Sequence, residues 1–197
     1  EQQRLRGSAC RSCISGVARS HLLSYEREGA LLEELFTHDG SGTLIAQNPY
    51  EQARSADIND IASIVEVIRP LEDSGALVKR SRERLEEEIG YFSILERDGR
   101  VLACAALYPY EAESVGEIAC VATHPDYRGT GRARQLLDEL LAEAKALSLT
   151  HVFVLTTQST HWFLEQGFET ASLDELPVEK QLLYNWQRNA AVLRRAV

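Results

Sequence analysis

The sequence contains no methionine, and it has little that would support a metal site or a membrane span. One C-x-x-C pair, Cys10 and Cys13, stands near the start, but no second pair follows at zinc-finger spacing, so we expect no metal. No apolar run is long enough to cross a bilayer. The start at Glu1 lacks the basic-then-apolar layout of a secretory signal, so we expect a cytoplasmic protein. A chain without methionine is expected to be a segment of a longer protein, or a sequence from which methionines were left out.

Positive charge is also scarce, because 21 Lys and Arg face 30 Asp and Glu, for a formal net charge of -9. Affinity for nucleic acid comes largely from clustered Lys and Arg, so nucleic acid is not an expected partner, and neither is a membrane. An anionic ligand would need a local basic site. The 197 residues, 44% of them hydrophobic, are enough for one domain with its own core plus an appendage.

The domain organisation is predicted from breaks in the hydrophobic pattern. Residues 1–46 form a short segment with a strand at 21–23, a helix at 30–36 and a glycine-punctuated stretch at 39–42. Residues 47–51 are interpreted as a linker, because Asn and Pro interrupt regular structure there. The main domain is expected to cover residues 52–197.

The first helix of the main domain is predicted from apolar residues at offsets of three or four. These residues are Ile58, Ile61, Val65 and Ile68. We expect this helix to end at Arg69, because the residue before a proline, here Pro70, is disfavoured in helical conformation. A second helix is expected around Leu85 and Ile89.

The rest of the domain alternates between strand and helix patterns, which predicts a mixed α/β fold. Strands are expected at 91–97, 100–108, 115–123 and 151–156. The first two flank Asp98-Gly99, a pair typical of a tight hairpin. One helix carries an apolar face of Leu136, Leu137, Leu140, Leu141, Ala144 and Leu147. The remainder of the chain is expected to form a short helix and further strands.

A glycine-rich turn lies between a predicted strand and this helix. Its sequence is Arg128-Gly129-Thr130-Gly131-Arg132-Ala133. Such a turn points backbone N–H groups at an anion, and the helix dipole adds to the attraction, which suits a pyrophosphate. The pattern is not a P-loop, since no G-K-[ST] follows, nor a dinucleotide fingerprint, because Arg134 stands where Gly or Ala is needed. A coenzyme A loop remains, with a simple glycine turn that caps a helix as the alternative.

The motif Arg128-x-x-Gly131-x-Ala133 resembles the coenzyme A loop of the GNAT acetyltransferases. Segments 121–125 and 162–168 resemble the same superfamily. The resemblance implies a mixed central sheet flanked by helices, with acetyl-CoA as the acetyl donor and no metal. It implies cofactor contacts along the splayed strand and the loop, at Ile118, Cys120, Val121, Arg128, Gly129, Gly131, Arg132 and Ala133. For Cys120 alone, a small buried hydrophobe is the favoured alternative to any reactive role.

A narrower set of motifs is similar to the bacterial N-acetylglutamate synthase family. Segments 104–109, 116–122, 153–157 and 176–188 carry this resemblance. It implies transfer of acetyl to the amine of L-glutamate, the first step of arginine biosynthesis. Residues 1–46 resemble the end of an amino-acid-kinase domain, and in arginine-regulated members this implies L-arginine contacts at Glu34 and Gly40. Members with a kinase domain assemble, so a homo-oligomer is also a hypothesis.

The same resemblance implies roles for catalytic and substrate-binding residues. Glu117 is expected to be the general base and Thr156 the proton donor to sulfur, with Tyr184 as the alternative acid. The two carboxylates of glutamate call for cations, and the expected ones are Arg80, Lys180 and Arg188. Solvated surface charges are the alternative for all three. Two other functions stay open: a GNAT enzyme for another amine, such as a protein N-terminus or a polyamine, and a non-catalytic acyl-CoA sensor.

Overall fold

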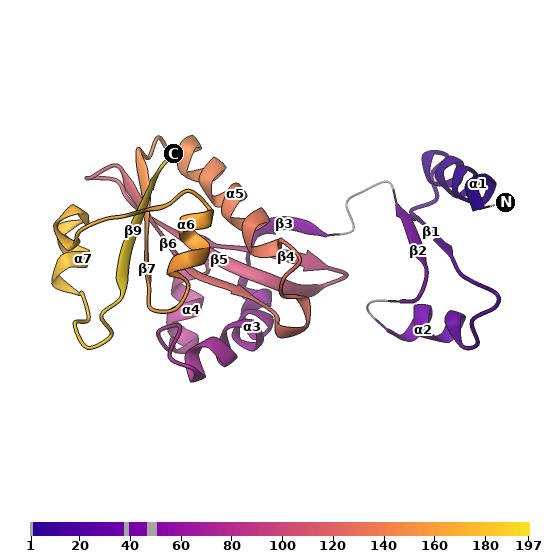
Figure 1. The fold of residues 1–197 in the computed structure, drawn as a ribbon, viewed down its shortest axis with the longest axis horizontal. Coiled ribbons are helices and arrows are strands. Elements are labelled where there is room, and N and C mark those ends of the chain that lie inside the picture. The colour runs from indigo at the N-terminus through magenta and orange to yellow at the C-terminus, as the bar shows by residue number, and fades with distance from the viewer. Residues whose placement is uncertain (1, 38–39, 47–50) are drawn as a thin grey trace. The chain divides into compact units, whose positions relative to one another are not determined.

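A computed structural model of the chain describes residues 2–37, 40–46 and 51–197 (Figure 1). It divides the chain into two compact units, Glu1–Tyr50 and Glu51–Val197, each with its own internal contacts. Most of the predicted linker, at 47–50, lies outside the described residues, and so does Asp39 of the glycine-punctuated stretch. Residue 51 belongs to the second unit.

The first unit pairs a two-stranded antiparallel sheet with two helices. Its elements are α1 (Gln2–Ile14), β1 (Arg19–Leu22), α2 (Ala30–Phe36) and β2 (Thr43–Ala46). The strand and the helix predicted at 21–23 and 30–36 are confirmed, the strand with a shift of bounds. Helix α1 was not predicted, because its sequence is largely polar and gives no apolar stripe.

The second unit is built on a seven-stranded sheet in the order β3-β4-β5-β6-β7-β9-β8 (Figure 1). The strands are β3 (Gln52–Ser55), β4 (Phe92–Arg97), β5 (Arg100–Tyr110), β6 (Val115–Thr123), β7 (His151–Thr156), β8 (Glu169–Thr170) and β9 (Ala191–Ala196). Every neighbouring pair is antiparallel except β6 with β7, which is parallel. The predicted mixed sheet is therefore confirmed.

Helices cover both faces of this sheet. They are α3 (Ile61–Asp73), α4 (Arg82–Glu88), α5 (Arg132–Ala146), α6 (Thr160–Glu165) and α7 (Val178–Leu182). Side chains of β5 alternate between the faces, as the two-residue period of a strand requires. Ala103 and Ala105 pack in the cluster with α5, whereas Cys104 and Ala106 pack in the cluster with α3. Figure 1 shows α5 and α3 on opposite sides of the strands. None of the described helices is long and apolar enough to span a membrane.

Several predicted boundaries in the second unit are wrong. Helix α3 does not end at Arg69 but continues through Pro70 to Asp73. Leu71, in the last turn after the proline, packs against the buried cluster, and this contact outweighs the loss of one intrahelical hydrogen bond at Pro70. Ile58 precedes α3 in a 3-10 turn and is 56% exposed.

Two further details differ from the expectations for this unit. Leu147 was predicted on the buried face of its helix, but it follows the end of α5 and is half exposed. Strand β3, at the edge of the sheet, was not predicted at all, because its four residues show no apolar alternation.

Candidate active site

The central feature of the site is a fork between β6 and β7. These parallel strands pair only from Val115 to Glu117 on β6, opposite His151 to Phe153 on β7. Beyond Glu117 the two strands no longer pair, so backbone groups on the inner edges of the fork are available to a ligand. The splayed strand expected from the GNAT resemblance is confirmed by this pairing.

A β-bulge in β6 shapes the same part of the fork. On the β5 side, Ala106 pairs with Ala119 and Cys104 with Ala122, so one residue of β5 faces two of β6. Cys120 lies in the bulge with φ 55°, a left-handed conformation that is uncommon for a residue with a side chain. Bulges of this kind re-aim side chains and are frequent next to active sites. Here the bulge turns Cys120 toward a cavity that it helps to line.

The glycine turn leads from β6 into α5. Gly129 and Gly131 have φ of 76° and 84°, and a Cβ added at either would meet no atom within 4 Å. The space around both glycines is therefore open, and the first backbone N–H groups of α5, which follow directly, have no partner within the helix. With the helix dipole, this arrangement suits a phosphate group. The residues present fit the pyrophosphate of coenzyme A.

The arginine side chains of the turn point elsewhere. Arg132 Nε donates to Glu51 Oε2 at 2.9 Å, and its guanidinium lies over the Tyr127 ring, 5.2 Å from the centroid. Arg128 Nε donates to the carbonyl of Thr123 at 3.4 Å. The side chain of Arg132 thus fixes the start of α5 against Glu51, and the predicted cofactor contact of Arg132, which would come from its backbone, stays a prediction.

A cavity of about 360 Å³ lies beside the fork. It is lined by Ala76, Leu77, Val78, Arg80, Arg84, Glu117, Ala119, Cys120, Leu155, Lys180, Leu183, Tyr184, Asn185, Arg188 and Ala190. The three cations predicted to bind substrate and the predicted base, Glu117, therefore line one cavity although they are far apart in sequence. Four of its residues are Lys or Arg and one is acidic, so its walls are cationic.

Glu117 is the buried acid of this cavity. Its side chain is 9% exposed, and its Oε2 lies 2.6 Å from Lys180 Nζ. The register opposite places Tyr108 of β5 across from Glu117. A buried carboxylate needs a cationic partner such as Lys180, because an unpaired charge in this position would destabilise the fold.

The two arginines are held at the rim by main-chain acceptors. Arg80, in the loop between α3 and α4, is 12% exposed in its side chain, and Nη1 donates to the Val78 carbonyl at 3.2 Å. Its Nε is buried without a hydrogen-bond partner. Arg188 Nη2 donates to the carbonyls of Gly75 and Ala76 at 3.0 and 3.1 Å. Arg188 therefore ties its own segment to the loop that carries Arg80.

The two candidate acids sit differently. Thr156 ends β7 next to Leu155, a cavity residue, and its hydroxyl accepts the backbone N–H of Ser159 at 3.0 Å. Tyr184 lines the cavity, and its hydroxyl donates to the Ala190 carbonyl at 2.7 Å. Both assignments stay predictions.

The Cys120 thiol is not activated as a nucleophile. Burial, opposed by the nearby Arg80 charge, raises the pKa of Cys120 to about 11. A reactive cysteine requires a lowered pKa, because the thiolate is the nucleophile. This agrees with the interpretation of Cys120 as a small buried side chain beside the ligand.

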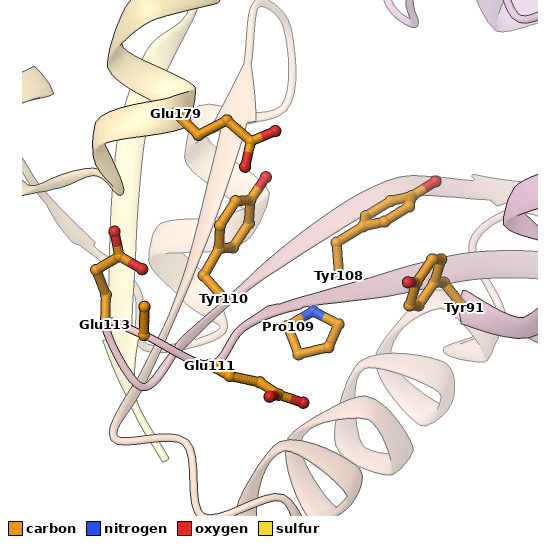
Figure 2. Close-up of a pocket in the computed structure, with 8 residues that line it drawn as sticks. Tyr91, Tyr108, Pro109, Tyr110, Glu111, Glu113 and Glu179 are labelled. Atoms are coloured by element: carbon orange, nitrogen blue, oxygen red, sulfur yellow. The ribbon is translucent and has the colours of Figure 1, made fainter.

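A second, acidic cavity of about 380 Å³ was missed in the sequence (Figure 2). It is lined by Tyr91, Tyr108, Pro109, Tyr110, Glu111, Ala112, Glu113 and Glu179. Burial and the nearby Glu117 and Glu179 raise the pKa of Tyr110 above its ordinary value. Glu179 and Lys180, neighbours on α7, line different cavities. In the sequence, Tyr108 and Tyr110 alternate with Pro109 along β5, and this two-residue spacing places both tyrosines on one face of the strand.

The N-terminal unit brings Glu34 and Gly40 together, as the resemblance implied. Glu34 Oε2 accepts the backbone N–H groups of Ser41 and Gly42 at 2.7 and 2.9 Å, and Oε1 contacts His21. A Cβ added at Gly40 would collide with the Glu34 carboxylate. Hydrogen bonding by His21 and Ser41 lowers the pKa of Glu34 below its ordinary value. The predicted arginine contact of this pair stays a prediction.

A forked mixed sheet with a glycine turn at the head of a long helix defines an acyl-CoA-dependent acyltransferase. The chain belongs to the acetyltransferase (GNAT) family, which it matches over residues 58–168. It is 56% identical over 189 residues to the amino-acid acetyltransferases of Proteus mirabilis (strain HI4320) and Serratia proteamaculans (strain 568). The matches cover 96% of this chain and 42% and 43% of those proteins, so it spans less than half of their length.

Two solved structures of N-acetylglutamate synthase from Neisseria gonorrhoeae are also similar. The one complexed with coenzyme A and L-arginine is 40% identical, with a TM-score of 0.88, over 99% of this chain and 44% of that chain. The one complexed with coenzyme A and N-acetyl-glutamate is 42% identical, with a TM-score of 0.73, over 98% and 46%.

Proposed function

We propose that this chain transfers the acetyl group of acetyl-CoA to the α-amine of L-glutamate. The observation that carries the proposal is the cationic cavity beside the fork, in which Arg80, Lys180 and Arg188 surround a single buried acid, Glu117. A dicarboxylate fits such walls, because guanidinium and ammonium groups bind carboxylates through charge-assisted hydrogen bonds. The similarity to a synthase solved with N-acetyl-glutamate supports the same acceptor.

The proposed mechanism is direct transfer. Glu117 accepts the proton that the amine loses, and the amine nitrogen bonds to the thioester carbonyl carbon. The carbon–sulfur bond breaks, and the sulfur leaves with the bonding electrons and takes a proton from Thr156 or Tyr184. Lys180 serves first as the partner of Glu117 and then of a substrate carboxylate, which leaves Glu117 available as the base. The fork and the first turn of α5 hold the donor, so that its acetyl end lies beside the cavity.

A cationic acceptor is the second candidate, and the acidic cavity favours it. Glu111, Glu113 and Glu179 line that cavity with tyrosines (Figure 2), which suits a polyamine or the amine end of a peptide. Two lines of argument favour glutamate: Glu117 and Cys120 of the fork line the cationic cavity, and so do the three cations carried over from the synthase family.

The test is release of CoA thiol from acetyl-CoA with L-glutamate, L-aspartate, L-glutamine, spermidine or a peptide amine. We expect turnover with L-glutamate, reduced at least about 100-fold in kcat by Glu117→Gln. Glu139→Gln, on the exposed side of α5, is the matched control and should keep full activity. Preference for spermidine or peptide would replace the acceptor, and binding of CoA without any turnover would favour a sensor.

We also infer that the N-terminal unit is the end of an amino-acid-kinase domain that contributes to an L-arginine site through Glu34 and Gly40. Support comes from their proximity and from the similarity, over 99% of this chain, to a synthase solved with L-arginine. Calorimetric titration with L-arginine, compared between the chain and Glu34→Gln, tests it. Sedimentation with and without L-arginine tests the expected homo-oligomer. Equal binding by the variant would contradict the assignment.

A further inference from the structure

Arg80 depends on its surroundings for its orientation. It lies in the irregular segment between α3 and α4, and a loop residue must be fixed by contacts that secondary structure does not supply. Its backbone N–H donates to Glu72 Oε1 at 2.9 Å, which fixes the main chain. Its side chain is 12% exposed, and its Nε is buried without a hydrogen-bond partner. The Glu88 carboxylate forms an ion pair with this side chain, with Oε2 3.8 Å from Arg80 Nε.

Glu88, the last residue of α4, is itself held in place by two side chains, one from β5 and one from its own helix. Tyr108 of β5 donates its hydroxyl to Glu88 Oε2 at 2.7 Å, and Arg84, one turn earlier on α4, donates Nε to Oε1 at 2.7 Å. The carboxylate is 17% exposed. Burial alone would raise the pKa of Glu88, but hydrogen bonds from Tyr108 and Arg84 and the charge of Arg80 lower it. Glu88 therefore stays ionised beside Arg80.

Tyr108 connects this network to the strand of the proposed base. It pairs with Glu117 in the β5–β6 register, and burial together with Glu88 raises its pKa, so that the hydroxyl remains a donor. Its ring packs against Tyr91 with centroids 5.0 Å apart. Figure 2 shows Tyr108 and Tyr110 leaving β5 in different directions, with Tyr110 toward Glu179. The hydroxyl of Tyr108 thus donates its hydrogen to Glu88, and its oxygen also stabilises the charge of Arg80.

We propose that Glu88, fixed by Tyr108, is a positioning residue that sets the direction of the Arg80 guanidinium and thereby the strength with which Arg80 binds the acceptor carboxylate. The inference rests on the proposed function. At 3.8 Å, Glu88 attracts the Arg80 guanidinium electrostatically but is too far away to accept a hydrogen bond from Nε. The guanidinium of Arg80, which lines the cavity, thus stays available for charge-assisted hydrogen bonds to a ligand carboxylate.

Glu88→Gln tests the proposal, since glutamine keeps the shape and an acceptor for Tyr108 but removes the charge. We expect KM for L-glutamate to rise about tenfold, with KM for acetyl-CoA unchanged and kcat within about threefold, as for loss of uniform substrate binding. Glu86→Gln is the matched control. Glu86 belongs to the same helix and makes the same i,i+4 pair, with Arg82 at 2.9 Å, but it lies on the exposed side.

Two further measurements separate the outcomes. Tyr108→Phe should raise KM for L-glutamate by a smaller factor, because the Glu88 carboxylate then loses one of the two side chains that donate hydrogen bonds to it. Calorimetric binding of glutarate, a dicarboxylate without an amine, should weaken in Glu88→Gln and not in Glu86→Gln. Equal glutarate affinity in both variants, or equal KM changes, would overturn the positioning role. If the wild-type chain binds glutarate but does not acetylate L-glutamate, the proposed function fails, and the glutarate comparison still decides the role of Glu88.

Discussion

Replacing Lys180 with methionine should destabilise the second unit, because it leaves Glu117 buried without its partner. At the observed 2.6 Å, two unit charges attract by about 6 kcal/mol at an effective dielectric constant of about 20, and by about 2 kcal/mol in bulk water. Glu117 is 9% and Lys180 25% exposed, and water in the cavity can partly rehydrate the carboxylate. We therefore expect a loss of about 2–4 kcal/mol.

Urea unfolding and calorimetry measure this loss, which corresponds to a fall in Tm of about 6–12 °C for a loss near 3 kcal/mol. Lys79→Met is the matched control, because Lys79 pairs with Asp73 at 3.6 Å on the surface, with side chains 74% and 64% exposed. It should leave stability unchanged. The double variant Lys180→Met/Glu117→Gln should recover most of the loss. If Lys180→Met costs no more than Lys79→Met, the pair contributes nothing and the reasoning from burial is refuted.

Three further predictions concern the turn, the sheet and the first 3-10 turn. Gly131→Ala and Gly99→Ala should cause the same backbone strain of about 1 kcal/mol, because φ is 84° and 78° and the space around both is open. Calorimetry should nevertheless show weaker CoA binding only for Gly131→Ala. Gly116→Val should cost at least about 1–3 kcal/mol in urea unfolding, because even a Cβ there comes within 2.8 and 2.9 Å of two leucine side chains. The hydrogen bond from Arg54 outweighs burial and lowers the pKa of Asp60 in the folded protein. Ionised Asp60 therefore stabilises the folded state above about pH 4, and this stabilisation is lost as the pH falls further. Unfolding followed from about pH 5 to 2 should therefore depend less on pH in Asp60→Asn, and an unchanged slope would contradict this.

Periodic segments of the fold were predictable from sequence, and segments fixed by tertiary contact were not. The strands at 115–123 and 151–156 have the predicted bounds, because their apolar runs end at clear turn residues. Strand β3 has no such pattern and exists through its pairing with β4. The proline rule failed at Pro70 because Leu71, in the turn that follows, packs against the buried cluster, and this tertiary contact outweighs the local preference.

The candidate site divides in the same way. Motifs placed Glu117, Arg80, Lys180 and Arg188 near one another, and the structure brings all four to one cavity. No motif indicated the ion pair between Glu117 and Lys180, because it depends on the position of a five-residue helix, α7, above the sheet. The role inferred for Glu88 could not be predicted from the sequence either, because its three partners come from a loop, a helix and a strand that only the fold brings together.

The cations of the cavity have a consequence beyond holding carboxylates. A like charge nearby disfavours the charged form of an amine, so the guanidinium of Arg80 and the ammonium of Lys180 both favour the neutral amine that the reaction needs. In the proposed mechanism Glu117 therefore needs less basicity to accept the proton, and its partner Lys180 moves to a substrate carboxylate before that proton is accepted. Binding and activation are thereby coupled. An acceptor without a carboxylate would leave Lys180 on Glu117 and the base occupied. On this reasoning, simple amines should be poor substrates even where they fit, and Lys180→Met should narrow the gap in kcat/KM between L-glutamate and a monoamine.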